Sequence, residues 1–301
     1  MKTIIKLAIL GFLFILLLDA SSTVACTIIT VRNSRIVFFA GNQDWYPVDS
    51  YLVVDKTGKF GVVFFAHPAK SYELPMMKGI NEKGLSYDSN WIPKEKLIPH
   101  PERDAQFEWV IITHMRDSST VEEILSKILT YNFGDSMDYQ IHFADKSGNA
   151  VVLYPGTNDE LTYSRIPKGN GYLITTNFNH ARREKVTWSP LDFIYSFLFD
   201  GTYETADNML SKVVDQDDLA VEFMASVLNA THRDWLFNTR FSIKTLFSTV
   251  FDLKNLKIFL YYKRQFDKPF VLDVKKELDK TDSYRKISLE ELVSKRRKNK
   301  E

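Results

Sequence analysis

Cysteine is almost absent from this sequence, since Cys26 is the only one among 301 residues. A single cysteine excludes an intramolecular disulfide, and it leaves one thiol that is either reactive or linked to another molecule. Hydrophobic residues make up 45% of the chain and charged residues 26%, which is the composition of a folded protein with a substantial core. The position of this lone thiol in the sequence is therefore of particular interest.

Excess charge and the common catalytic motifs are absent as well. The formal net charge is +1, so no overall field favours nucleic acid or an anionic membrane, and we expect no nucleic-acid partner. The six histidines show no pair with metal-ligand spacing and no H-E-x-x-H motif: His67, His100, His114, His142, His180 and His232. There is no G-x-S-x-G elbow and no P-loop. We therefore expect neither a metal nor another cofactor.

A long apolar run is also missing. The run from Leu7 to Leu18 is short of the roughly 20 residues that span a bilayer. Lys2 and Lys6 precede this run, and the small, mild residues 20–25 follow it, which is the pattern of a secretory signal peptide. An uncleaved membrane anchor is the less favoured alternative, because the polar, small-residue stretch follows so soon.

The predicted cleavage site lies directly before the cysteine. Ala25 is at position −1 and Thr23 at position −3, so cleavage would make Cys26 the first residue of the mature chain. We therefore expect export, with the protein secreted, periplasmic or lumenal. The expected organisation is a signal peptide at 1–25, one domain at 26–275 and a charged, solvated tail at 276–301.

Strands and helices are expected in blocks rather than in strict alternation. The expected strands are 27–31, 36–40, 51–55, 60–66, a short one after the turn at 79–85, 140–144, 150–154, 161–165, 172–176, 245–251, 257–262 and 270–274. The expected helices are 103–115, 121–131, 190–199, 203–214, 220–228 and a short one opened by Ser288. This order disfavours a parallel doubly wound sheet and favours layered antiparallel sheets flanked by helices, an α+β fold.

An N-terminal cysteine would carry its own base. The thiolate is the nucleophilic form, and a free thiol has a pKa of about 8.5. The free α-amine, with a pKa of about 7.7–8.0, is partly neutral near pH 7 and can take the thiol proton directly or through water. In the precursor the same nitrogen is an amide without basicity. Removal of residues 1–25 would therefore activate Cys26 as well as complete export.

Two polar residues at strand ends are candidates to assist such a nucleophile. Asp44 ends a strand that can pair with the Cys26 strand, and its carboxylate would hold the amine by a charge-assisted hydrogen bond. Asn177 also follows a strand, and its amide would donate to an oxyanion. The alternative is that both are ordinary turn residues, and spacing alone favours that alternative.

Several segments in a fixed order resemble one enzyme family. They are Cys26-Thr27, Gly41-Asn42-Gln43-Asp44-Trp45, Gly79 to Leu85, Ile141 to Gly148, Thr176-Asn177 and Thr245 to Asp252. Together they resemble the linear-amide amidohydrolases, which include bile salt hydrolases, penicillin V acylases and acyltransferase-like proteins. The resemblance runs from Cys26 to about Asp273, nearly the whole mature chain.

The resemblance implies an αββα sandwich that hydrolyses a linear, non-peptide amide of a small N-acyl substrate through an S-acyl enzyme. It implies that Cys26 is the nucleophile and that Asp44 orients the amine. It further places Asn177 and Asn90 at the oxyanion and Arg240 as a late active-site arginine. Aromatic residues next to these segments are candidates for an acyl pocket: Trp45, Tyr46, Trp91 and Phe178. Related enzymes are often tetramers, so a homo-oligomer is expected.

One position departs from the family. Bile salt hydrolases and penicillin V acylases carry an arginine three residues before the aspartate, where this sequence has Gly41. An arginine near the thiol would lower its pKa and help to hold the amine. Its absence argues against a specialist for bile salts or penicillin V, and it leaves the substrate open.

Other functions remain as alternatives. Cys26 could be the lipidated first residue of a membrane-anchored lipoprotein that acts as a binding module, although Thr23 stands where such proteins usually carry leucine. A catalytically inactive binding protein of the same family and an acyltransferase are further alternatives, because acceptor choice depends on pocket shape. A pairing of the thiol with His142 or His180 is a weaker one, since it would not need Cys26 at the cleavage point.

Overall fold

The computed structural model describes residues 26–68, 76–105, 110–182, 201–214, 219–233 and 243–298. The expected signal peptide at 1–25 and the helix expected at 190–199 lie outside the described residues. No helix in the described part of the chain is both long enough and apolar enough to cross a bilayer.

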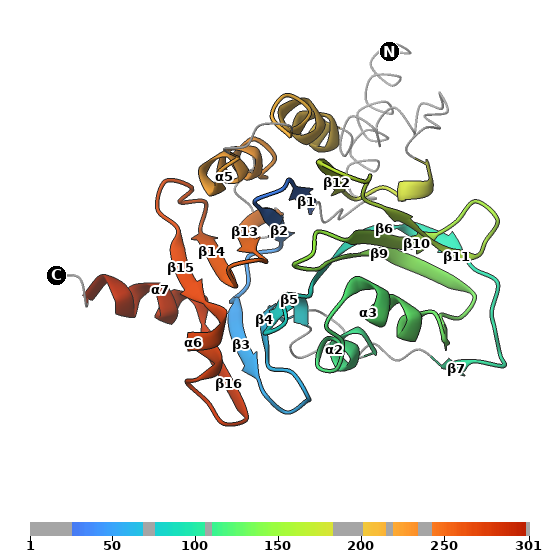
Figure 1. Ribbon diagram of the computed structural model, residues 1–301, viewed down its shortest axis with the longest axis horizontal. Coiled ribbons are helices and arrows are strands. Elements are labelled where there is room, and N and C mark those ends of the chain that lie inside the picture. The colour runs from blue at the N-terminus through green and yellow to red at the C-terminus, as the bar shows by residue number, and fades with distance from the viewer. Residues whose placement is uncertain are drawn as a thin grey trace, which may run out of the picture.

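Two antiparallel sheets form the centre of the structure (Figure 1). The first sheet has the order β12-β1-β2-β13-β14-β15, with β1 Ile28–Arg32, β2 Val37–Trp45, β12 Gly171–Thr175, β13 Lys244–Asp252, β14 Lys257–Tyr262 and β15 Phe270–Asp273. The second has the order β11-β10-β9-β6-β5-β4-β3-β16, with β3 Tyr51–Asp55, β4 Val62–Ala66, β5 Met76–Asn81, β6 Ser86–Lys96, β9 Ser136–Ala144, β10 Ala150–Pro155, β11 Leu161–Arg165 and β16 Tyr284–Ser288.

Helices cover the outer face of each sheet (Figure 1). Helices α2 (Val110–Met115) and α3 (Val121–Ile128) pack on the second sheet, and the helical residues 201–210 and α5 (Val221–Ala230) pack on the first. The remaining elements are β7 Asp104–Ala105, β8 Tyr131–Asn132, the short 3-10 helix His180–Arg182, α6 Val274–Leu278 and α7 Leu289–Lys298. The arrangement is the expected αββα sandwich.

The alternation of side chains along each strand builds the layers. On β2, Phe39 points between the sheets, where it packs against Phe251. Its neighbours Phe38 and Ala40 point to the other face, into the core beneath α5. Successive side chains of a strand face opposite sides, so a strand buried on both faces is apolar throughout. This is why residues 36–40 could be predicted as a strand from apolar composition alone.

Several elements differ in extent from the prediction. The helix expected at 103–115 begins later, because residues 104–105 form strand β7, which pairs in parallel with β8. The strand expected to be short is the eleven-residue β6. Thr120 is the N-cap of α3, and its side chain accepts a hydrogen bond from the backbone N–H of Glu123.

The charged C-terminal segment is part of the sandwich, although the sequence predicted that the domain ends at residue 275 and a charged tail follows. Strand β16 pairs along its length with β3 and closes one edge of the second sheet. Leu289 and Leu292 of α7 are buried in the core between the sheets. The charges of the segment gave no sign of this, because its pairing partner lies more than 200 residues earlier in the chain.

Candidate functional site

Cys26 lies just before β1, where strands of both sheets meet. Its side chain is 4% exposed, and its Sγ lies 3.8 Å from the backbone oxygen of Asp44 on β2. From the second sheet, Nδ2 of Asn90 on β6 donates a hydrogen bond of 2.8 Å to the backbone oxygen of Cys26. The structure thus brings together three residues that the sequence proposed from separate segments.

Asp44 is held from the neighbouring strand. It is fully buried as the penultimate residue of β2, and its Oδ1 accepts a hydrogen bond of 2.5 Å from the hydroxyl of Thr245 on β13. Its Oδ2 is buried and has no hydrogen-bond partner among the described atoms. A free carboxylate oxygen at this position fits the predicted contact with an N-terminal amine.

A bulge in β13 creates the Thr245 contact. Phe247 pairs with Gln43, and the register of the two strands shifts between Thr245 and Phe247. Thr245, and not Leu246, therefore lies opposite Asp44. Directly opposite residues of an antiparallel pair share a face of the sheet. The extra residue therefore places a hydroxyl, rather than an apolar side chain, against the carboxylate.

Strand β6 connects the two predicted oxyanion residues, because it carries Asn90 and also binds the side chain of Asn177. Asn177 follows β12 by two residues, and its Nδ2 donates a hydrogen bond of 2.8 Å to the backbone oxygen of Trp91, the residue after Asn90. Gln140 on β9 supports the same segment, because its Nε2 donates to the backbone oxygens of Thr176 and Phe178. An amide nitrogen carries two N–H donors, so a carbonyl bond fixes its orientation while using one of them.

Gly41 faces a buried ion pair. Lys78 on β5 and Asp88 on β6 lie opposite each other in the sheet, 2.6 Å apart, and both are buried. A Cβ atom at Gly41 would lie 2.9 Å from Asp88 Oδ2 and 3.1 Å from Lys78 Nζ. The sequence showed only that residue 41 is glycine where the resembling family carries an arginine. The structure supplies a cation from another strand, and the sequence analysis missed it.

Charge and burial together shift the pKa values of the site. Burial raises the pKa of the Cys26 thiol strongly; the carboxylates of Asp44 and Asp88 add to this, and Lys78 opposes it. Burial raises the pKa of Asp44 to about 7, against the lowering effects of Thr245, Arg233 and Lys78. The thiol therefore needs a base or nearby positive charge to become a nucleophile.

Arg233 is an arginine close to this site in the described part of the chain. Arg240 lies outside the described residues. Arg233 is a described arginine that acts on the site, since its charge lowers the pKa of Asp44, while burial lowers its own pKa against the attraction of Asp44 and Cys26. Its backbone is tied to Thr245, whose Oγ1 accepts from the Arg233 N–H at 2.8 Å. No motif distinguished this residue in the sequence.

His142 makes its contacts within the core. Both ring nitrogens of His142 are hydrogen-bonded to threonines, at 2.9 Å to Thr30 and 3.3 Å to Thr175, and burial lowers its pKa to about 3. These bonds tie the second sheet to the first, and they disfavour a pairing of His142 with Cys26. Within the described ranges no three His, Cys, Asp or Glu side chains are grouped as metal ligands.

The four predicted aromatic residues lie near the site in different settings. Trp45 at the end of β2 packs against His67 with tilted rings, whose centroids are 4.9 Å apart, and it contacts Tyr46 edge-on at 6.1 Å. Trp91 is 36% exposed, which is unusual for so large an apolar side chain. Phe178 packs against Tyr203 under the first sheet's helices, and this is a core contact.

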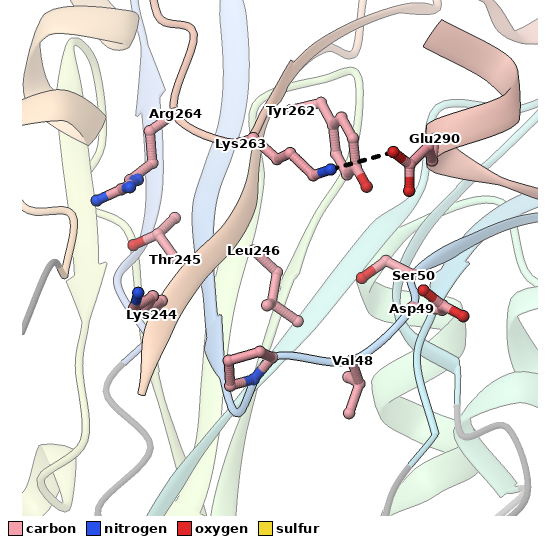
Figure 2. A pocket seen from close by; sticks show the side chains of 11 residues that line it. Val48, Asp49, Ser50, Lys244, Thr245, Leu246, Tyr262, Lys263, Arg264 and Glu290 are labelled. Carbon is pink, nitrogen blue, oxygen red and sulfur yellow. Dashed lines mark hydrogen bonds and ion pairs between the residues drawn. The ribbon is translucent and has the colours of Figure 1, made fainter. Parts of the chain in front are cut away.

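A pocket with a volume of about 450 Å³ adjoins the Asp44 contact (Figure 2). Thr245 and Leu246 of β13 line it, together with residues 47–50 and the end of β14, and Lys263 is paired with Glu290 across it. None of the four predicted aromatics is among the described residues that line this pocket. Apolar side chains such as Leu246 and Val48 and charged ones such as Lys263 and Glu290 line it together.

Comparisons with known proteins identify the fold. No protein-family model and no curated protein sequence matches the chain. A mutant of conjugated bile acid hydrolase from Clostridium perfringens has 13% identity and a TM-score of 0.61, covering 87% of this chain and 96% of its own. A second variant of that hydrolase gives the same identity and TM-score, covering 87% and 97%. Penicillin V acylase from Agrobacterium tumefaciens has 16% identity and a TM-score of 0.53, covering 88% and 91%.

These similarities extend over almost the whole of each chain. They confirm at the level of the fold the resemblance that the ordered sequence segments indicated. Identities of 13% and 16% are too low to carry a substrate from one protein to another. The chemistry has to be argued from the residues of the site.

Proposed function

We propose that this protein is an exported amidohydrolase that cleaves a linear amide of an N-acyl substrate, with Cys26 as an N-terminal nucleophile after removal of residues 1–25. The observation that carries the proposal is the convergence of the Cys26 thiol, the buried Asp44 residue and the Asn90 amide at the start of β1. Cys26 directly precedes β1, Asp44 comes from β2 and Asn90 from β6, and the three lie in a fold shared with a bile acid hydrolase and a penicillin V acylase.

The first half of the reaction forms an S-acyl enzyme. The neutral α-amine of Cys26 takes the thiol proton, and the thiolate attacks the carbonyl carbon of the substrate amide. Asp44 orients the amine through its free Oδ2, since its Oδ1 is held by Thr245. When the tetrahedral intermediate collapses, the C–N bond breaks and the leaving amine takes the proton from the α-ammonium group.

The second half releases the acid. The α-amine takes a proton from water, the hydroxide attacks the thioester carbon, and the C–S bond breaks to return the thiol and a free carboxylic acid. Asn90 and Asn177 are proposed to stabilise the oxyanion in both halves. Each amide is already oriented by a backbone carbonyl, which is the preorganisation that such stabilisation requires.

Burial of Cys26 weighs against the lipoprotein alternative. The side chain is 4% exposed, and β1 begins two residues later, which leaves no flexible tether between a lipid anchor and the domain. An acyltransferase would share the first half-reaction and pass the acyl group to another amine in place of water.

Oligomerisation of the chain is also part of the proposal, and analytical ultracentrifugation would measure it.

Two measurements test the proposal. The first is the intact mass and N-terminal sequence of the protein exported from a host expressing residues 1–301; we expect a chain that begins at Cys26. The second is release of p-nitroaniline from a series of N-acyl-p-nitroanilides of increasing acyl length, with the acylated Cys26 detected by mass. We expect the Cys26→Ser variant to lose nearly all of this turnover.

The outcomes separate the alternatives. A blocked N-terminus and a mass raised by acyl chains before any substrate is added would reject the proposal in favour of the lipoprotein. Wild-type turnover by the Cys26→Ser variant would reject the nucleophile. Transfer of the acyl group to added hydroxylamine in preference to water would favour the acyltransferase.

A further inference from the structure

A buried ion pair occupies the layer between the two sheets close to Cys26. Lys78 and Asp88 face the first sheet, because Asp88 lies opposite His142, and His142 in turn reaches across to Thr30 of β1. The surrounding layer is apolar, and Lys78 Nζ lies 5.8 Å from the ring centroid of Phe247. Two charges in such a place are costly to desolvate, and apolar residues of similar volume are often equally stable there. Stability alone therefore does not explain the pair.

The pair fills the space that Gly41 leaves. The nearest atoms to a Cβ built at Gly41 are Asp88 Oδ2, the backbone oxygen of Thr27 and Lys78 Nζ, all within 2.9–3.1 Å. Gly41 lies opposite Ile28 on β1, two residues from the nucleophile, and the backbone of Asn42 is bonded to Thr27. Absence of a side chain at residue 41 thus lets the ammonium group come close to the start of β1.

The positive charge of Lys78 influences the pKa values of three other buried groups in this region. It favours the ionised forms of Cys26 and Asp44, and it lowers the pKa of His67 to about 4 together with burial, which is the larger cause. The charged groups around the thiol in the described part of the chain are Asp44 from β2, Asp88 from β6, Lys78 from β5 and Arg233, which precedes β13. Two of these are carboxylates, which oppose ionisation of the sulfur.

We propose that Lys78 is a positioning residue for Cys26: held by Asp88 in the space beside Gly41, its ammonium group offsets the two carboxylates around the sulfur and favours the thiolate. The same positive charge favours the neutral form of the α-amine that accepts the thiol proton. This role rests on the proposed function, in which Cys26 is the nucleophile. It supplies from β5 the positive charge that the sequence at position 41 lacks.

The test uses the fact that Cys26 is the only thiol of the chain. The rate of its alkylation by iodoacetamide is measured between pH 6 and 10 for the wild type, Lys78→Met and Asp88→Asn, without any amide substrate. Below the thiol pKa this rate follows the thiolate fraction, and one pKa unit changes it about tenfold. At pH 8 we expect alkylation to slow roughly tenfold in Lys78→Met and to accelerate in Asp88→Asn.

Because the two variants should change the alkylation rate in opposite directions, an effect of charge can be distinguished from a loosening of the fold. Loosening of the fold would expose Cys26 and accelerate alkylation in both variants. The matched control is Asp55→Asn, which breaks the partly buried pair between Asp55 and Arg116 near the β3–β16 edge of the second sheet, and it should leave the alkylation profile unchanged. If Lys78→Met does not fold, the double variant Lys78→Met with Asp88→Leu removes both charges, and at pH 8 its alkylation should be slower than that of Asp88→Asn, which keeps Lys78; equal rates would overturn the proposal.

A shift of both single variants in the same direction, or no shift in either, would overturn the proposal. Because no substrate is used, the result is independent of the proposed function. Loss of the expected pH shifts with amide hydrolysis intact would reject only the role of Lys78. The expected shifts in a protein that cleaves no N-acyl amide would support Lys78 and reject the hydrolase.

Discussion

The hydroxyl of Thr245 donates a 2.5 Å hydrogen bond to the buried Oδ1 of Asp44, although the two residues are 201 positions apart. The same Oγ1 accepts the backbone N–H of Arg233, so one side chain joins β2, β13 and the segment that carries a nearby cation. Asp44 therefore has one oxygen fixed and one oxygen free. The orientation of the carboxylate depends on Thr245, which begins one of the family-like segments but had no predicted role.

Replacing Thr245 with valine should reduce the catalytic rate without unfolding the protein. The variant keeps the shape of the side chain but loses both hydrogen bonds, at a cost of about 1–3 kcal/mol in stability. We expect kcat/KM for N-acyl-p-nitroanilides to fall about tenfold or more, because Asp44 is no longer held. Thr245→Ser keeps the hydroxyl and is the control; an equal loss in both variants would show that the methyl group, not the hydrogen bond, matters.

Asp44→Asn should change how stability depends on pH. The pKa of Asp44 is about 7 in the folded protein against an ordinary 3.8, so between these values the folded chain binds a proton that the unfolded chain releases. The contribution of this proton to the free energy of unfolding is complete below pH 3.8 and is lost as pH rises through 7. The loss amounts to at most about 1.4 kcal/mol for each pH unit. Urea unfolding of both proteins from pH 4 to 8 should show that the variant gains stability relative to the wild type as pH rises.

The same variant should hydrolyse amides at least about 100-fold more slowly, because a neutral amide orients the α-amine less well than a carboxylate does. His67 and His142 have lowered pKa values and oppose the trend of Asp44 in acid, but they are present in both proteins and cancel in the difference. A variant that does not fold at any pH would assign Asp44 a structural role in place of a catalytic one.

Gly41→Ala should destabilise the protein although it adds one methyl group. The new Cβ would lie 2.9 Å from Asp88 Oδ2 and 3.0 Å from the backbone oxygen of Thr27. Overpacking of this kind costs about 1–3 kcal/mol, measurable as a lower urea midpoint. Gly201→Ala is the control, since no heavy atom lies within 4 Å of its Cβ position. Equal stability of Gly41→Ala and the wild type would contradict the close approach of the ion pair.

Deletion of residues 282–301 should abolish stable folding. It removes β16, which pairs with β3, and it removes the buried Leu289 and Leu292, each of which contributes about 1.5–3 kcal/mol. The exposed edge of β3 would also favour aggregation. Soluble yield and thermal unfolding measure the effect, and deletion of residues 299–301 alone is the control. A fully stable 1–281 chain would restore the view that the C-terminal segment is a solvated tail.

Local sequence determined most of the secondary structure and the candidate nucleophile. Runs of β-branched and aromatic residues predicted the strands at 51–55 and 257–262, because a strand buried on both faces has a local signature. The lone Cys26 after small residues, and the ordered segments around Asp44 and Asn177, needed no knowledge of the fold. Each of these features depends on residues that are close together in the sequence, so a local sequence pattern was enough to predict it.

The tertiary structure decided which distant residues complete the site. Lys78 and Asp88 sit in ordinary strand sequences, and only the pairing of β5 with β6 and the packing of the two sheets place them against Gly41. Thr245 meets Asp44 through a bulge, and the charged segment 284–288 completes a sheet whose partner strand lies near the start of the domain. Each contact joins residues far apart in sequence. Their energies depend on burial and register, which a one-dimensional pattern does not contain.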